Sequence, residues 1–358
     1  MTVDKLQTCP RLPMAQEEEV SKNGNAPPAG ELVQGSFRDF DVFAETVAGW
    51  DLSFLPLDPG GFRAELTQLF LPKGALLFCS MQQGVRQSGG LPPGCRTIGI
   101  PLAGCTPFKW LGYEVDSDVL MIFPRGGELD SRSQAGFQVI TLSLEECLLS
   151  ELAHREGLGW LLEVGGRVAR PPVQVLQRLR ENAEFLLKQA ISDPRALESR
   201  DLRTGVECDL AIETLHALAA EDLQPVKAMA TERSRILRQA LDMIEERVDE
   251  PLLVGDLSEA VGSSARTLRY AFEEKFGVPP KVYLKARRLS HLRQVLRTAD
   301  SEHTVSELAL ELGFMHLGQL AADYRRMFDE LPSETLGCRG LRVLRKKKGG
   351  PNERDGHA

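Results

Sequence analysis

The stretch that decides the fold is Leu252–Pro332, where one sequence pattern occurs twice. The first copy, residues 252–280, reads LLVGDLSEAVGSSARTLRYAFEEKFGVPP, and the second, residues 303–334, reads HTVSELALELGFMHLGQLAADYRRMFDELPSE. Equivalent residues lie 51 positions apart before the turn and 52 after it: Leu257 and Leu308, Gly262 and Gly313, Leu268 and Leu320, Phe272 and Tyr324, Phe276 and Phe328. Each copy predicts a short helix, a glycine-containing turn and a second amphipathic helix. This order is typical of a helix-turn-helix unit, whose second helix enters the major groove of DNA.

A further predicted helix, residues 281–298, joins the two units. At a rise of about 1.5 Å per residue it spans roughly 27 Å, while successive major-groove faces lie about 34 Å apart. When the width of the flanking helices is added, one chain has the reach to contact two adjacent turns of DNA. Ser264 is a suitable N-cap for the second helix of the first unit. Thr304 and Glu307 form the S/T-x-x-E capping box that starts the second unit.

Two such units on one connecting helix resemble the DNA-binding region of the AraC/XylS family of bacterial transcription regulators, over roughly residues 234–337. The motifs that carry the resemblance are Phe276-Gly277-Val278-Pro279-Pro280, Arg288-Leu289, Gly313-Phe314 and Phe328…Pro332. The stretch 313–336 is most similar to the branch that contains ethanolamine-utilisation regulators. The resemblance implies a cytoplasmic, nucleoid-associated regulator that binds double-stranded operator DNA, contacts RNA polymerase and activates more often than it represses.

The second helix of the first unit carries the best candidates for reading DNA. Leu268 and Phe272 are spaced to face the core, so Arg266, Arg269 and Tyr270 project on the other side. An arginine fork pairs with two acceptors on guanine at once. These positions match the base-contacting positions of the family, so we expect base contacts here.

The second unit is expected to read fewer bases. Its outward-facing candidates are Gly318, Gln319 and Ala322, of which only Gln319 pairs bidentately with adenine. The first unit should therefore supply most of the direct specificity, while the second anchors and orients the protein. The candidate phosphate contacts of the whole region are Thr267, Lys281, Arg287, Arg288, Arg325 and Arg326.

The charge distribution supports a local DNA-binding face. The chain carries a net charge of −8, of which residues 1–231 contribute −10, residues 232–348 +3 and the last ten residues −1. Phosphate binding needs a basic face rather than a basic chain. The repeated region is therefore the part suited to nucleic acid.

The first part of the chain is expected to be β-rich. Apolar runs at 62–71, 75–84, 96–102, 118–124 and 137–144 are separated by Gly- and Pro-containing stretches, which is typical of a sandwich or barrel. By resemblance, this is the cupin-like barrel in which the family senses small-molecule effectors. Residues 145–152, 173–192 and 207–220 predict helices. Their place beside a regulatory domain implies a homodimer interface, the alternative being that they only cap the β-rich core.

The predicted organisation is α+β and multidomain. It comprises a disordered tail (1–30), a β-rich cupin-like regulatory domain (31–148), a helical dimerisation segment (149–223), a linker (224–231), an all-α DNA-binding domain (232–338, with helix-turn-helix units at 254–277 and 304–328) and a basic tail (339–358). Arg86, Trp110 and Glu128 lie in or beside strand-like runs and are candidates for the effector pocket, although a tryptophan such as Trp110 is more often a plain core residue.

Several features argue against an enzyme, a cofactor or a membrane protein. Residues 1–153 contain no histidine, and imidazole is a principal ligand for catalytic iron, copper or zinc, so a cupin-type enzyme fused to a helical module is a remote alternative. No P-loop, G-x-G-x-x-G or G-x-S-x-G motif occurs. No window of 18 consecutive apolar residues predicts a membrane span.

The function predicted from these observations is a ligand-responsive activator of a metabolic operon. The effector and the operator are not identified by the sequence. The seven cysteines are odd in number and lack a C-x-x-C pair, which favours reduced thiols in a cytosolic protein. The alternative is a regulator, including a repressor, that is controlled by a protein partner or by thiol oxidation.

Overall fold

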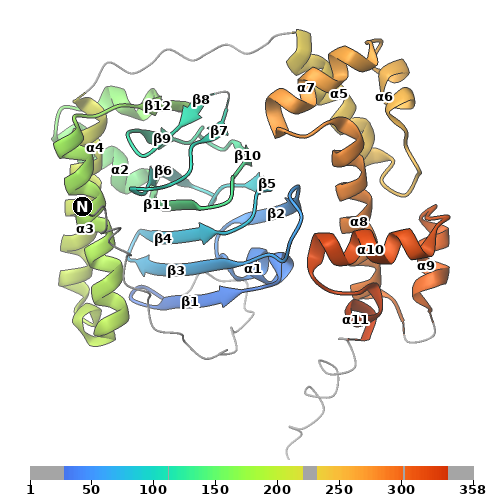
Figure 1. Ribbon diagram of the computed structural model, residues 1–358. Helices are drawn as coiled ribbons and strands as arrows, with labels where there is room; N and C mark the ends of the chain where they lie inside the picture. The colour runs from blue at the N-terminus through green and yellow to red at the C-terminus, as the bar shows by residue number, and fades with distance from the viewer. Residues whose placement is uncertain (1–27, 112, 221–231, 301–302, 338–358) are drawn as a thin grey trace, which may run out of the picture.

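A β-rich domain and a helical domain lie side by side in the computed structural model, which describes residues 28–111, 113–220, 232–300 and 303–337 (Figure 1). The predicted linker (224–231), the basic tail (339–358) and nearly all of the predicted disordered tail (1–30) lie outside the described residues, as do Cys9 and Cys338.

Two facing sheets form the N-terminal domain. The seven-stranded sheet has the order β1-β3-β4-β11-β6-β9-β12, and the five-stranded sheet has the order β2-β5-β10-β7-β8. The strands are β1 (Leu32–Phe37), β2 (Asp51–Pro56), β3 (Ala64–Leu71), β4 (Gly74–Met81), β5 (Val85–Gly90), β6 (Cys95–Pro101), β7 (Phe108–Trp110), β8 (Tyr113–Val115), β9 (Leu120–Ile122), β10 (Glu128–Arg132), β11 (Phe137–Glu145) and β12 (Arg167–Ala169). Neither sheet of the described residues closes on itself. A β-rich domain is thus confirmed, whereas closure into a barrel is not.

The apolar runs of the sequence account for the long strands. The five predicted runs fall on β3, β4, β6, β9 and β11, and their side chains are buried on both faces of the seven-stranded sheet. One face packs inside the domain, with the short helix α1 (Phe40–Thr46). The other face is covered by helices α2 (Glu146–Arg155), α3 (Val173–Ser192) and α4 (Arg200–Ala219). Two short 3-10 turns, η1 (Gly159–Glu163) and η2 (Pro194–Leu197), connect these elements.

The predicted amphipathic helix 173–192 is confirmed as α3 with the same bounds. Its buried side chains are Leu176, Leu179, Ala183, Leu186, Leu187 and Ala190, all of which the spacing of three and four residues selected. They pack with α4 onto the seven-stranded sheet. These helices therefore complete the core of the N-terminal domain, while Val173 and Phe185 remain exposed on the outer side of α3.

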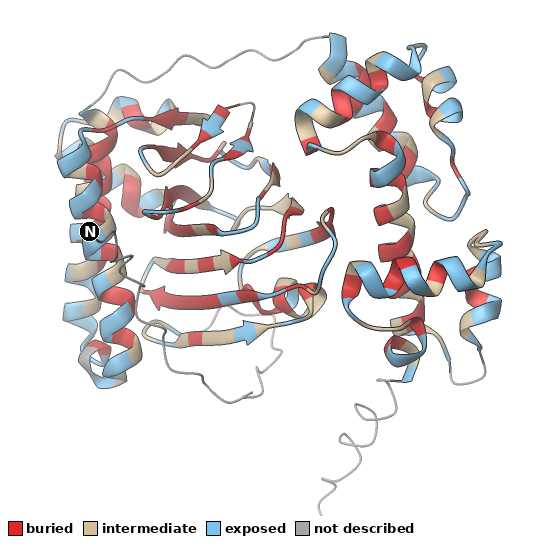
Figure 2. Ribbon diagram, viewed as in Figure 1, coloured by how far each residue is buried: buried red, intermediate tan, exposed pale blue. Residues whose placement is uncertain are grey.

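The C-terminal domain contains the two predicted helix-turn-helix units. Its helices are α5 (Glu232–Glu246), α6 (Val254–Ala260), α7 (Ala265–Phe276), α8 (Pro280–Thr298), α9 (Val305–Glu311), α10 (Leu317–Phe328) and α11 (Pro332–Gly337). The long helix α8 carries one unit at each end (Figure 1). Figure 2 shows buried residues at intervals along α8, because both units and the N-terminal domain pack against it.

Local interactions set the helix boundaries of this domain. Ser264 Oγ accepts a hydrogen bond from the Thr267 N–H at 3.1 Å and starts α7. Thr304 and Glu307 form the predicted capping box, with reciprocal bonds of 3.2 and 2.8 Å. Gly277 ends α7 in the left-handed region, at φ 63°, which glycine adopts without steric cost.

Candidate nucleic-acid interface

The first turns of α7 expose the residues predicted to read bases. Leu268 and Phe272 are fully buried, whereas Arg266, Arg269 and Tyr270 are exposed. The helix therefore presents two guanidinium groups and a phenol to solvent at its N-terminal half, the end that enters the major groove in helix-turn-helix proteins.

These side chains already have partners on their own helix. The Arg266 guanidinium lies 5.1 Å from the centre of the Tyr270 ring, and Arg269 Nε is 2.7 Å from Glu273 Oε1. Both are exposed interactions, which contribute little to stability in water. Exchanging them for contacts with a base edge therefore costs little.

The second recognition helix, α10, exposes Gly318, Gln319 and Ala322. His316 stands at its N-cap and makes no capping hydrogen bond through its side chain. Asp323 is 93% buried and pairs with Lys285 of α8 and with Arg326 at 2.7 Å. Burial raises the pKa of Asp323, but hydrogen bonds from Lys285 and Gln319 outweigh it and hold the pKa below its usual value.

Some candidate phosphate contacts have exposed side chains, whereas others are bonded to neighbouring residues of the protein. Lys281, Arg325 and Arg326 are exposed. Arg287 is paired with Glu245 at 2.6 Å. Arg288 donates two hydrogen bonds of 3.0 Å, to the carbonyl oxygens of Leu312 and Gly313, and its guanidinium lies 4.4 Å from the Phe314 ring centre.

Two of these candidates therefore have internal structural roles. Arg288 fastens the turn of the second unit to α8, a role that the sequence pattern did not reveal. Thr267, half-buried, shares its hydroxyl with the N-cap, since its Oγ1 lies 2.9 Å from Ser264 Oγ.

The opposite ends of both recognition helices contact the N-terminal domain. At the end of α7, Lys275 Nζ lies 3.1 Å from Asp130 of β10. At the end of α10, the carbonyl of Arg326 accepts a 2.8 Å hydrogen bond from the Gly60 N–H. The N-terminal ends, which are predicted to read bases, stay exposed, while the far ends contact the N-terminal domain.

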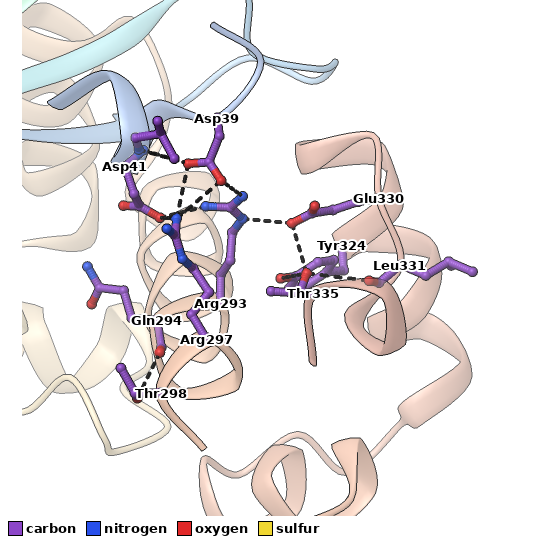
Figure 3. A network of polar contacts seen from close by, with 11 residues as sticks. Asp39, Asp41, Arg293, Gln294, Arg297, Thr298, Tyr324, Glu330, Leu331 and Thr335 are labelled. Carbon is purple, nitrogen blue, oxygen red and sulfur yellow. Dashed lines mark hydrogen bonds and ion pairs between the residues drawn. The ribbon is translucent and has the colours of Figure 1, made fainter. Parts of the chain in front are cut away.

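A buried arginine holds α8 and the second unit to the N-terminal domain (Figure 3). Arg293, only 5% exposed, lies 2.9 Å from Asp39, 2.6 Å from Asp41 and 2.8 Å from Glu330. Arg297, one turn on, contacts both aspartates at 3.0 and 2.6 Å. We call these five residues the Arg293 cluster.

The Arg293 cluster is set in an apolar contact between the domains. The Arg293 guanidinium lies 4.7 Å from the Phe40 ring centre and 5.5 Å from that of Phe328, and the two ring centres are 5.9 Å apart. Phe40 belongs to α1 and Phe328 to α10, so the apolar cores of the two domains are continuous here.

The pKa values of the two aspartates of the cluster are shifted in opposite directions. Burial raises the pKa of Asp41, and its neighbour Asp39 adds to that effect. Burial also acts on Asp39, but Arg293 and Arg297 together with a backbone hydrogen bond outweigh it and lower the pKa of Asp39. The two carboxylates share the same cations, and the cations stabilise the ionised form of one carboxylate more than that of the other. The two pKa values therefore shift in opposite directions.

A second contact ties the first unit to the five-stranded sheet. Arg86 of β5 donates to the Tyr283 hydroxyl and lies 5.3 Å from the Phe276 ring centre. Its Nε is 3.1 Å from Asp130. Burial raises the pKa of Tyr283 to about 12, so the hydroxyl stays protonated at neutral pH.

A small cavity lies between the two sheets. Its volume is about 60 Å³, and its lining comes from α1, from the five-stranded sheet and from the inner face of the seven-stranded sheet. The lining is apolar apart from Gln87, Ser131 and Thr141. Only Trp50 and Leu52 among the lining residues are half-buried, which places the cavity's solvent side there.

The three residues proposed from sequence for an effector pocket do not gather at this cavity. Arg86 is engaged at the domain interface, and Trp110 is 99% buried in the core, where its ring centre lies 5.0 Å from that of Phe123. Glu128 is exposed at the start of β10. Arg86 and Glu128 lie on the strand faces opposite to the cavity-lining Gln87 and Leu129, and strand-like position alone does not tell which face a side chain occupies.

The five-stranded sheet separates the cavity from the DNA-binding domain by a single layer. In β5, Gln87 lines the cavity and the adjacent Arg86 contacts Tyr283. In β10, Ser131 lines the cavity and the adjacent Asp130 pairs with Lys275. Successive residues of a strand point to opposite faces. One face of this sheet therefore lines the cavity, and the other face contacts the DNA-binding domain.

In the described part of the chain, no group of three or more His, Cys, Asp or Glu side chains is arranged to hold a metal ion. Among the helices described, none has the length and apolarity to cross a membrane. Cys79, Cys95, Cys105, Cys147 and Cys208 are free.

Sequence comparisons agree with the geometry of the C-terminal domain. Residues 257–337 match a family model described as a helix-turn-helix domain. The XylDLEGF operon transcriptional activator of Pseudomonas putida is 36% identical over 99 residues, which cover 27% of this chain and 31% of that protein. XylDLEGF operon transcriptional activator 2 of the same organism is 34% identical over 107 residues, covering 30% of this chain and 68% of that protein. Several of these relatives are thus matched over only about a third of their length.

Other relatives align over more of the chain. The thermoregulatory protein LcrF of Yersinia pestis is 23% identical over 227 residues, covering 62% of this chain and 81% of that protein. Among solved structures, the AraC-like transcriptional activator CuxR aligns over 72% of this chain and 94% of its own, with 17% identity and a TM-score of 0.41. ToxT of Vibrio cholerae aligns over 81% and 98%, with 12% identity and a TM-score of 0.26. At these TM-scores the structural likeness carries no conclusion.

Proposed function

Because the chain belongs to the AraC/XylS family of transcription regulators, we propose that it is a sequence-specific DNA-binding regulator that activates a metabolic operon in response to a small-molecule effector. Its first helix-turn-helix unit reads bases through Arg266 and Arg269, and the second unit reads through Gln319 and orients the protein. Thr267, Lys281, Arg325 and Arg326 contact phosphates.

One observation carries the DNA-binding proposal. The N-terminal turns of α7 expose two arginines on a helix whose opposite face is fully buried. Arginine is the residue that most often discriminates guanine in the major groove. A helix of this kind, joined by α8 to a second unit, has the form of a recognition helix.

A footprint on the DNA upstream of the protein's own gene and its neighbours would locate the operator. On that site, Arg266→Ala and Arg269→Ala should each weaken binding by about 1–3 kcal/mol and relax the base preference at one position. The matched control is Arg178→Ala, an exposed arginine on α3, in the N-terminal domain. If both α7 variants bind the operator as tightly as the wild type at matched salt, the reading face is assigned wrongly.

The cavity between the sheets supports an effector site. It lies against the inner face of the five-stranded sheet, whose outer face contacts Lys275 of α7 and Tyr283 of α8. An effector that changes the position of this sheet changes the surface that the far end of α7 contacts.

Control by oxidation of the thiols of Cys79, Cys95 and Cys105 finds less support. Burial raises the pKa of Cys79, of Cys95 and of Cys105. A thiol held in its protonated form reacts slowly with oxidants, because the thiolate is the nucleophile. A small-molecule effector therefore remains the better-supported signal.

Finer features of the assignment are also proposed. The two facing sheets suit the cupin-like regulatory domain of the family, and the exposed outer side of α3, with Val173 and Phe185, supports a homodimer. RNA polymerase is the proposed protein partner of an activator, and a DNA binder would reside with the bacterial nucleoid in the cytoplasm. The stretch 313–336 supports the branch of ethanolamine-utilisation regulators.

A further inference from the structure

The lining of the cavity restricts the charge of its ligand. Among the residues that surround it, none carries an ionisable acid or base other than the thiol of Cys79, and burial raises the pKa of that thiol. A charged group placed there would lose its hydration without gaining a partner of opposite charge. The ligand is therefore uncharged over the part that enters.

One polar group in the cavity lacks a partner. Thr141, on β11, is 95% buried, and its Oγ1 has no hydrogen bond among the described residues. Buried hydroxyls in folded proteins are almost always hydrogen-bonded. The Thr141 hydroxyl is therefore available to bond a molecule that enters the cavity. Gln87 and Ser131 add two further polar side chains from the facing sheet.

The volume restricts the size of the ligand. About 60 Å³ is roughly four times the space that one water molecule needs. A long chain or a sugar with many hydroxyls does not match such a space or such a lining. A compact ring with one hydrogen-bonding group does.

We propose that the cavity binds a compact, uncharged, mainly apolar molecule that forms one hydrogen bond with the Thr141 hydroxyl. This inference rests on the proposed function, because it names the chemical class of the effector that the regulator would sense. It places the ligand against Ser131 and Gln87, on the strands whose neighbouring residues hold the DNA-binding domain.

Three probes of similar shape test the charge and the hydrogen bond on the full chain: cyclohexanol, methylcyclohexane and cyclohexanecarboxylate. Binding is followed by NMR of [13C-methyl]methionine-labelled protein, because Met81 and Met121 line the cavity. Met315 is 77% exposed on the DNA-binding domain and serves as an internal reference. Cyclohexanol is expected to shift Met81 and Met121 but not Met315, and to bind more tightly than either of the other probes.

The isosteric variant Thr141→Val replaces the hydroxyl by a methyl group of similar size. It should weaken cyclohexanol binding roughly two- to ten-fold, leave methylcyclohexane binding unchanged and raise the melting temperature of the free protein. The matched control is Thr214→Val in α4, which removes a buried hydroxyl bonded to the Leu210 carbonyl at 2.7 Å. That variant should lower the melting temperature and leave probe binding unchanged.

Three results would overturn the inference: tighter binding of the carboxylate than of the alcohol, equal affinity of wild type and Thr141→Val for cyclohexanol, or no shift of Met81 and Met121 with any probe. Each leaves the DNA-binding proposal standing if the footprint is present. Loss of the footprint with intact probe binding would instead reject the regulator and retain the ligand site.

Discussion

Replacing Arg293 by methionine should weaken the interaction between the two domains, so that they no longer unfold together. The change keeps an unbranched apolar stem against Phe40 and Phe328 but removes the guanidinium, which is 5% exposed and contacts three carboxylates at 2.6–2.9 Å. Removing one partner of a buried ion cluster leaves uncompensated charge and costs about 3–5 kcal/mol. Arg297 still reaches Asp39 and Asp41, and Thr335 still donates to Glu330 at 2.8 Å. We therefore expect a loss near the lower limit, about 3 kcal/mol.

The positions of the tryptophans allow the two domains to be followed separately. All three tryptophans, Trp50, Trp110 and Trp160, lie in the N-terminal domain, so fluorescence reports its unfolding. Far-ultraviolet circular dichroism also records the C-terminal domain, which is helical. In guanidinium titrations, Arg293→Met should move the two transitions apart and lower the denaturant midpoint detected by circular dichroism.

Two control variants test the reasoning. Arg297→Met removes a guanidinium that is 20% exposed and should cost less, because solvent screens it. Arg293→Lys keeps the charge but lacks the planar fork that reaches three carboxylates, so it should recover only part of the loss. Unchanged midpoints and coincident transitions in Arg293→Met would refute the claim that this cluster joins the domains.

Three other predictions concern separate contacts. Lys281→Ala and Arg325→Ala should weaken binding to operator and non-specific DNA equally and flatten the salt dependence by about one unit each; a sequence-selective loss in binding assays would contradict a phosphate role. Burial raises the pKa of Asp130, but Lys275 and Arg86 outweigh it and lower the pKa overall, so its stabilisation is present above the usual value of about 3.9 and is lost as the pH falls through the lower folded value. Asp130→Asn should thus reduce stability at pH 7 by about 1 kcal/mol and flatten its acid dependence in denaturation measured from pH 7 to pH 2; equal curves for variant and wild type would exclude the ion pairs as a source of stability. Thr304→Ala should cost about 1 kcal/mol in thermal unfolding, and a loss as small as that of the exposed control Ser306→Ala would show that the capping box is unimportant.

The helices of the C-terminal domain could be predicted because their signals are local. Ser264, the Thr304–Glu307 pair and Gly277 each act within one turn of the residues that they terminate. The apolar repeat also predicts, without any knowledge of contacts, that Leu268 and Phe272 lie in the core. The exposure of Arg266 and Arg269 follows directly from that placement.

The contacts between the domains could not be predicted, since they join residues far apart in the chain. Arg293 and Asp39 are separated by 254 positions, and nothing in the spacing around either residue indicates the other. The same limit applies to Arg288, whose neighbours in sequence suggest a solvent-facing cation although it holds the Gly313 turn. Strands of three residues, such as β7 and β8, are also too short for alternation to identify them.

The continuous apolar contact between the domains has a consequence for solubility. A fragment that ends before α5 would uncover Phe40, Leu55 and Leu57, which pack against residues of the C-terminal domain in the whole chain. Uncovered apolar patches of this kind promote self-association. The separate N-terminal domain is therefore expected to aggregate when expressed alone, and polar replacements at Leu55 and Leu57 should reduce that aggregation.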